Sequence, residues 1–113
     1  SVQAGARFIV TPPVHDAEQL KPAAARVAGL GVPLIARVIL LKSVGMARYI
    51  NRNVVGVQVP DAVIKRLRKA PDKGAEALAV AADLAHGLED CCRGVVFVSL
   101  GWETRLPALI DLL

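Results

Sequence analysis

Three short apolar runs divide the chain, at residues 7–11 (RFIVT), 33–41 (PLIARVILL) and 94–100 (GVVFVSL). Each run is almost continuously apolar and rich in valine and isoleucine, which is typical of strands that are buried on both faces. A proline pair follows the first run and a glycine follows the third, and both residue types interrupt strands. We therefore predict three strands that are covered by helices.

The segments between these runs have the spacing of amphipathic helices. Asp16 is a predicted N-cap, with Gln19 three residues later in a capping-box arrangement. We expect a kink or a restart at Pro22, because proline lacks the amide proton and clashes with the preceding turn. Further helices are predicted over residues 44–51, 63–69, 74–88 and 105–112.

Strands that alternate with helices indicate an α/β fold with a parallel sheet. Connections between such strands are right-handed, so we predict that the three strands are parallel neighbours in chain order. Three strands cannot close an eight-stranded barrel, and the 113 residues form a single segment without internal repeats. Because the chain starts at Ser1 and soon enters a strand, we expect it to be part of a longer polypeptide.

Hydrophobic residues make up 54% of the chain and aromatic residues only 4%, so the predicted core consists of alanine, valine, leucine and isoleucine. A disordered chain would be far more polar. The net charge of +4 is spread along the sequence, except for the basic run KRLRK at residues 65–69. We interpret this run as a solvated helix face rather than a phosphate-binding patch, and we expect no nucleic-acid partner.

Cys91 and Cys92 are adjacent, and a disulfide between neighbours is rare because it needs a specific Cβ separation. No second cysteine pair completes a zinc site, so we predict two reduced thiols, no metal and a cytoplasmic location. No apolar run reaches the ~18 residues that a membrane span needs, so we expect no membrane association.

Polar side chains and the only tryptophan gather where the predicted strands end. These residues are Thr11, Pro12, His15, Lys42, Ser43, Trp102 and Glu103. The carboxyl ends of parallel strands lie at one edge of a sheet, where α/β proteins bind ligands, so this edge is the candidate site. The indole of Trp102 is either a pocket wall that stacks on a planar ligand or a hydrophobic lid over the strand ends.

Three stretches of the chain resemble segments of one enzyme family. The stretch AGARFIVTPPVHD (residues 4–16) is similar to AGA-x-F-x-x-T-Q-x-x-F-D in methylenetetrahydrofolate reductases. Residues 33–67 resemble the P-x-I-x-G-I-x-x-L-K-S stretch of that family, with its Met-Ala pair and its later Val-Pro. Residues 94–107 (GVVFVSLGWETRLP) resemble the closing strand of the branch found in acetogens and related anaerobes, which ends in L-G-W-E.

The resemblance implies both a fold and an activity. The chain would form the last three strand–helix units of a (βα)8 TIM barrel and would be incomplete on its own. The complete enzyme would use FAD to reduce 5,10-methylene-tetrahydrofolate to 5-methyl-tetrahydrofolate. The family's catalytic carboxylates and most of its flavin contacts lie upstream, so we assign no catalytic residue here and leave the cofactor-binding residues unknown. The segment alone is therefore expected to be inactive and to bind FAD weakly.

The resemblance also implies that part of this chain faces the folate. The substrate-binding residues inferred from it are Thr11, Pro12, Met46, Trp102 and Glu103. Pro12 stands where the family has a folate-binding glutamine, and proline cannot supply the donor and acceptor of an amide. Arg37 stands where the family has a glycine, so it would enter the barrel interior or need a carboxylate partner. These departures keep a second hypothesis open, a non-catalytic or repurposed barrel module that serves subunit interaction.

Several candidates have a structural alternative. Glu103 is either an acceptor for the pterin or the first-turn acid of the last helix, and we favour the second role. We interpret His15 as solvated rather than as a general acid, and Ser43 as an N-cap rather than an anion contact beside Lys42. The expected partners are the folate substrate, the N-terminal part of the barrel and a redox partner subunit, in an oligomer.

Overall fold

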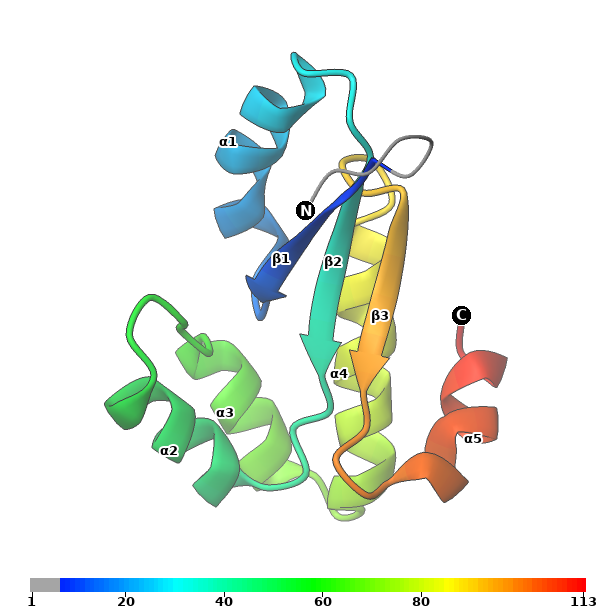
Figure 1. Cartoon of the computed structure of the whole chain (residues 1–113). Coiled ribbons are helices and arrows are strands. Elements are labelled where there is room, and N and C mark those ends of the chain that lie inside the picture. Colours follow the sequence, from blue (N-terminus) through cyan, green and yellow to red (C-terminus); the bar gives the residue numbers. More distant parts are fainter. Residues whose placement is uncertain (1–6) are drawn as a thin grey trace.

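A parallel sheet of three strands lies at the centre of this computed structural model, which describes residues 7–113 (Figure 1). The strands are β1 (Ile9–Pro13), β2 (Leu34–Ile39) and β3 (Gly94–Val98), and they lie side by side in chain order. Both neighbouring pairs are parallel, with Arg37 of β2 opposite Val96 of β3. The predicted order and direction of the strands are confirmed.

The first strand begins and ends two residues later than the predicted range 7–11. It ends at Pro13, so its two prolines lie inside the strand and not after it. The pairing of β1 with β2 is irregular between Val10 and Pro13, which marks a bulge. Proline is tolerated at bulges and in edge strands, because the ladder needs no N–H donor there. The proline pair therefore marks an irregular edge strand rather than the end of a strand.

Within residues 7–113, five α-helices and one short 3-10 helix follow the strands. They are α1 (Ala17–Ala28), α2 (Val44–Asn53), α3 (Asp61–Lys69), α4 (Lys73–Gly87) and α5 (Leu106–Asp111), with the 3-10 helix η1 (Glu103–Arg105) before α5. Side-chain oxygens of Asp16, Ser43 and Asp72 each accept a backbone N–H at 3.0 Å at the start of α1, α2 and α4. The N-caps predicted for Asp16 and Ser43 are confirmed. None of the described helices is long and apolar enough to cross a membrane.

Helix α1 is continuous through Pro22, so the predicted restart is wrong. The carbonyl group of Glu18 has no helical donor at this point, because proline lacks the N–H group. Glu18 and Pro22 are both exposed, so water can replace the missing hydrogen bond. The buried residue of α1 is Ala24, and the helix therefore packs through a small side chain.

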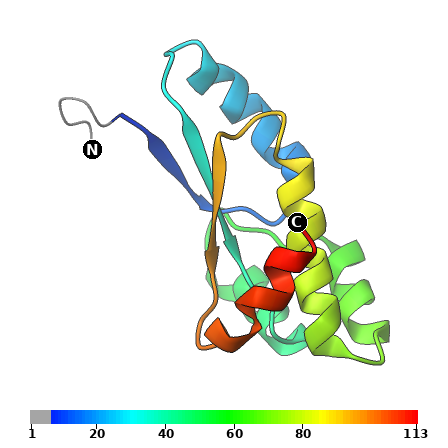
Figure 2. The same cartoon turned by 90° about the vertical axis from the view of Figure 1, so that its right-hand side faces the viewer.

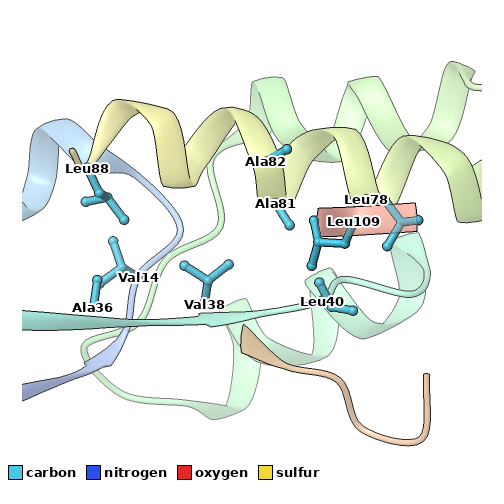
Figure 3. Packing of buried hydrophobic residues seen from close by; sticks show 9 residues of the cluster. All are labelled: Val14, Ala36, Val38, Leu40, Leu78, Ala81, Ala82, Leu88 and Leu109. Atoms are coloured by element: carbon cyan, nitrogen blue, oxygen red, sulfur yellow. The ribbon is translucent and has the colours of Figure 1, made fainter. Parts of the chain in front are cut away.

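Helices α4 and α5 pack on one face of the sheet through a cluster that we call the sheet core (Figure 3). Its buried members are Val14, Ala36, Val38, Leu40, Leu78, Ala81, Ala82, Leu88 and Leu109. β2 contributes alternate residues to this core, and α4 contributes Leu78, Ala81 and Ala82. The alanines of α4 leave room for the helix to lie close to the strand. Leu40 and Leu109 at one end of this core and Ala36 and Leu88 at the other have no exposed area, so the core is closed along its length (Figure 3).

The opposite face of the sheet is uncovered in the part of the chain that the structure describes. Helices α1, α4 and α5 all lie on one side of the strands (Figures 1 and 2). The other side, which we call the open sheet face, consists of Val10, Ile35, Arg37, Ile39, Val96 and Val98. Val96 is 47% exposed and Arg37 is exposed as well. The prediction of strands buried on both faces is therefore correct for one face and wrong for the other within residues 7–113.

A second cluster, the helical core, joins α2, α3 and α4 beyond the end of β2. Its buried members are Leu41, Ala47, Ile50, Val59, Ile64, Leu67, Ala77 and Val80. The side-chain amide of Asn51 donates to the carbonyl of Val59 at 3.0 Å and accepts the N–H of Val59 at 2.7 Å. Val59 is fully buried, so this pair satisfies two backbone groups that water cannot reach. Asn51 thus fixes the loop between α2 and α3.

Candidate functional site

The carboxyl ends of the three strands lie at one edge of the sheet, which we call the rim (Figure 1). At the rim, β1 leads into residues 14–16 before α1, and β2 leads into Lys42 and Ser43 before α2. β3 leads into residues 99–102 before η1. The candidate residues from the sequence therefore belong to three neighbouring connections.

A cavity of about 180 Å³ opens at the rim. The end of β1, the start of α1 and residues 56–58 line it, and we call it the rim cavity. Thr11 and Pro12 border it together with His15 and Gln58. No local signal in the sequence marks Gln58, because it reaches the rim from the distant loop between α2 and α3. Its exposed amide is a functional group that sequence reasoning missed.

Thr11 has a structural role in the bulge of β1. The residue is buried, and its Oγ1 atom accepts the backbone N–H of Arg37 at 3.1 Å. The carbonyl of Arg37 in turn accepts the N–H of Val14 at 2.9 Å. The hydroxyl of Thr11 thus replaces a backbone acceptor where β1 leaves regular register with β2. No hydrogen bond within residues 7–113 uses its hydroxyl proton, and Thr11 borders the rim cavity.

His15 is buried, so the interpretation that it is solvated is wrong. It is only 8% exposed, and its Nε2 atom has no hydrogen-bond partner within the described part of the chain. Burial disfavours the charged imidazolium and lowers the pKa of His15 from its ordinary value of 6.5. The rim cavity is therefore bordered at neutral pH by an uncharged imidazole and not by a cation.

Trp102 joins the two cores at the rim. Its partly buried indole packs against both the sheet core and the helical core. The guanidinium of Arg105 lies 4.4 Å from the centroid of the indole ring, and Nζ of Lys42 lies 5.8 Å from it, which are cation–π distances. The same ammonium donates to the carbonyl of Leu100. These contacts favour the lid interpretation of Trp102, and they also fix the position of the indole at the rim.

The turn before Trp102 explains the glycine of the L-G-W-E stretch. Leu100 and Gly101 have φ values of 50° and 93°, both in the left-handed region. The N–H of Trp102 donates to the carbonyl of Ser99 at 3.1 Å and closes the turn. Any residue with a Cβ atom would be strained at position 101, so the turn that returns the indole to the cores requires glycine there.

The other predicted residues lie at the rim without forming one pocket. Met46, in the first turn of α2, is half-buried against the helical core, as Trp102 is. Glu103 is exposed and begins η1, which agrees with its interpretation as a first-turn acid. The rim cavity is not lined by Met46, Trp102 or Glu103. The structure therefore places Thr11 and Pro12 at the rim cavity, whereas Met46 and Trp102 pack against the helical core.

Cys91 and Cys92 lie just before β3, at the edge of the sheet opposite the rim. Their Sγ atoms are 3.7 Å apart and both thiols are free. Burial, and then the hydrogen bond with Cys91, raise the pKa of Cys92 to about 12. Cys92 is therefore a thiol at neutral pH and a poor nucleophile. No group of three His, Cys, Asp or Glu side chains within residues 7–113 is placed to hold a metal ion.

Thr11→Val tests the structural role of the hydroxyl. The substitution removes the acceptor of the Arg37 N–H and is expected to lower the free energy of unfolding by about 1–3 kcal/mol, the cost of an unsatisfied buried group. Thr11→Ser keeps the oxygen and should lose less stability. Urea denaturation of the three proteins measures the difference, and a Thr11→Val protein as stable as the wild type would show that the bond contributes nothing.

His15 is expected to make the protein less stable in acid. Because its folded-state pKa lies below that of the unfolded chain, the unfolded state binds more protons as the pH falls below 6.5. The melting temperature should therefore drop more between pH 7.5 and 5.5 in the wild type than in a His15→Phe variant. Identical pH profiles of the melting temperature for wild type and His15→Phe would refute the lowered pKa of His15.

Comparison with known proteins agrees with the resemblance of the three stretches. The family model described as methylenetetrahydrofolate reductase matches residues 1–104. This range contains all three strands, helices α1 to α4 and the rim as far as Glu103. No curated protein matches the chain. The match covers far more than half of the sequence, and the chain belongs to the methylenetetrahydrofolate reductase family.

Proposed function

We propose that this chain supplies three consecutive strand–helix units to a barrel enzyme that reduces 5,10-methylene-tetrahydrofolate to 5-methyl-tetrahydrofolate. The observation that carries the proposal is the family match over residues 1–104. A parallel sheet with helices between its strands is the unit that such a barrel repeats. The L-G-W-E stretch after β3 favours the branch found in acetogens and related anaerobes.

The open sheet face supports the barrel. Parallel sheets are normally covered on both faces, yet Val96 and Arg37 are exposed here. In a (βα)8 barrel the inner face is filled by side chains from the other strands. We therefore assign the open sheet face to the barrel interior, where strands outside this chain would cover it. Alone, the chain would expose this face and two unpaired strand edges, so we expect it to self-associate.

The rim is the proposed folate-binding side of the barrel. Thr11 offers a hydroxyl proton, and Gln58 offers an amide in the same cavity. Trp102 presents an indole that can stack on a planar pterin or benzoyl ring, and the adaptable side chain of Met46 packs against the same helical core. The exposed carboxylate of Glu103 can accept hydrogen bonds from the N–H groups of a pterin. Each of these groups binds or orients the substrate rather than reacting with it.

FAD is the cofactor that the resemblance implies, but the rim residues of this chain do not form a flavin site by themselves. The rim cavity of about 180 Å³ is smaller than the roughly 300–1,000 Å³ typical of pockets for ligands of drug size. We propose that parts of the barrel outside this chain hold the flavin. Weak FAD binding and no reductase activity are expected of the isolated chain for this reason.

Arg37 favours a second candidate function. Its side chain is exposed on the open sheet face, and none of the ion pairs within residues 7–113 includes it. Inside a barrel an unpaired guanidinium would be costly unless a carboxylate from another strand met it. Without such a partner, the chain would serve as a non-catalytic barrel module that binds another subunit. The two candidates differ in whether the complete protein binds folate.

Trp102→Ala in the complete protein that contains this chain tests the proposal. If the indole stacks on the substrate, folate binding should weaken by about 1–3 kcal/mol, as for aromatic stacking on planar bases. The flavin content should stay unchanged, because the flavin contacts lie elsewhere. Folate titration and flavin absorbance measure both quantities. Tyr49→Ala removes an exposed aromatic side chain of α2 and should change neither.

Two outcomes would count against this reading. A lower melting temperature with unchanged folate affinity would make Trp102 only a lid. A complete protein that binds neither flavin nor folate would contradict the proposed function itself and favour the interaction module.

A further inference from the structure

Positive charge gathers in a groove between α2 and α3. The groove has a volume of about 530 Å³ and is lined by Arg48, Asn51, Arg52, Asp61, Ile64, Lys65 and Arg68. Four cationic side chains and one carboxylate line it, which leaves a net charge of +3. Two of the cations come from each helix, so the sequence alone does not bring them together. We call this surface the basic groove.

The cations of the basic groove are not neutralised within residues 7–113. The ion pairs there join Lys21 to Glu18, and Arg66 to both Glu76 and Asp83. Arg66 belongs to the same basic run as Lys65 and Arg68, but it points to α4 and its Nη1 atom lies 2.8 Å from Asp83. Arg66 is therefore paired with α4. Lys65 and Arg68 instead line the groove with α2 and form no ion pair within residues 7–113.

This arrangement carries an electrostatic cost in the free protein. Like charges on facing helices repel, and the repulsion is screened only beyond roughly 10 Å at 0.1 M salt. Asp61 offsets one charge, but as the first residue of α3 it is also stabilised by the helix dipole. The floor of the groove is fixed by other constraints, because Ile64 is buried in the helical core and Asn51 is bonded to Val59. An anion in the groove would convert the repulsion into attraction without a change of shape.

We propose that the basic groove binds a compact oligophosphate, such as the diphosphate or triphosphate group of a nucleotide-sized molecule. Three of its four cations are arginines, and the planar guanidinium forms paired hydrogen bonds with phosphate oxygens. Its volume lies within the roughly 300–1,000 Å³ of small-molecule sites. No aromatic side chain lines it, so it lacks the stacking platforms of single-stranded nucleic-acid sites. It shares no residue with the rim cavity, and the proposal therefore does not depend on folate binding.

Sodium tripolyphosphate is the probe for this site. Added to the purified protein at low salt, it should bind with saturation in calorimetry and raise the melting temperature, and both effects should weaken as salt is added. Arg48→Gln combined with Arg52→Gln should lower the affinity at least about tenfold. Arg26→Gln combined with Arg93→Gln removes the same charge from exposed positions outside the groove and should change the affinity less than about twofold.

A second readout needs no ligand. Without tripolyphosphate, an Arg48→Gln protein should melt at the wild-type temperature or above it, because repulsion across the groove is relieved. Arg52 is kept in this test because it lies in the last turn of α2, where the helix dipole favours a cation. A lower melting temperature of the Arg48→Gln protein would show that this arginine stabilises the fold on its own and would contradict the proposal.

Three binding results would also overturn the proposed oligophosphate site. Equal loss of affinity in the two double variants would mean unspecific attraction to a basic protein. Citrate binding as tightly as tripolyphosphate would remove the preference for phosphate. A duplex oligonucleotide that binds more tightly than tripolyphosphate, and loses its affinity in the groove variant, would make the surface a nucleic-acid site.

Discussion

The burial of only one face of β2 is the constraint on which the rest of this structure depends. Ala36, Val38 and Leu40 pack against α4 and α5, while Arg37 between them faces away from every described helix. Because β2 is the central strand, its two ladders also fix the positions of β1 and β3. Helices cover one face of this sheet. The open sheet face leaves apolar area in water, at a cost of about 25 cal/mol per Å². A parallel sheet of this composition is complete only when another layer covers that face.

The same arrangement decides what the rim can do. Because the strands are parallel, three connections begin at the same edge of the sheet. Several side chains there both stabilise the fold and border the candidate site. Thr11 satisfies the backbone of β2, and Trp102 seals the junction of the two cores. Burial beside the rim cavity lowers the pKa of His15 and disfavours its charged form. A substitution at the rim therefore changes stability as well as binding. The structural and the binding role of such a residue are separated only when stability and ligand affinity are both measured.

Features with local causes follow from the sequence, whereas features that need distant segments do not. Apolar runs rich in valine and isoleucine mark the strands, and the caps at Asp16 and Ser43 follow from side chains that bond within three residues. The burial of His15 depends on packing against later elements, and Gln58 reaches the rim cavity from another connection. The basic groove needs α2 beside α3, so the arginines of α2 carry no signal for it in the sequence. The family resemblance identifies the reaction class, because it rests on several motifs in order rather than on one residue.

The assignment of the open sheet face to a barrel interior can be tested most directly at Val96. In the complete protein, with every native cysteine replaced by serine, the maleimide reaction rates of Val96→Cys and Val55→Cys variants are compared. Val96 is 47% exposed in this chain and Val55 is 99% exposed. If further strands cover the open sheet face, Val96→Cys should react at least about tenfold more slowly than Val55→Cys when folded, and equally fast in denaturant. Equal rates in the folded protein would contradict the barrel and leave the sheet with one face open to solvent.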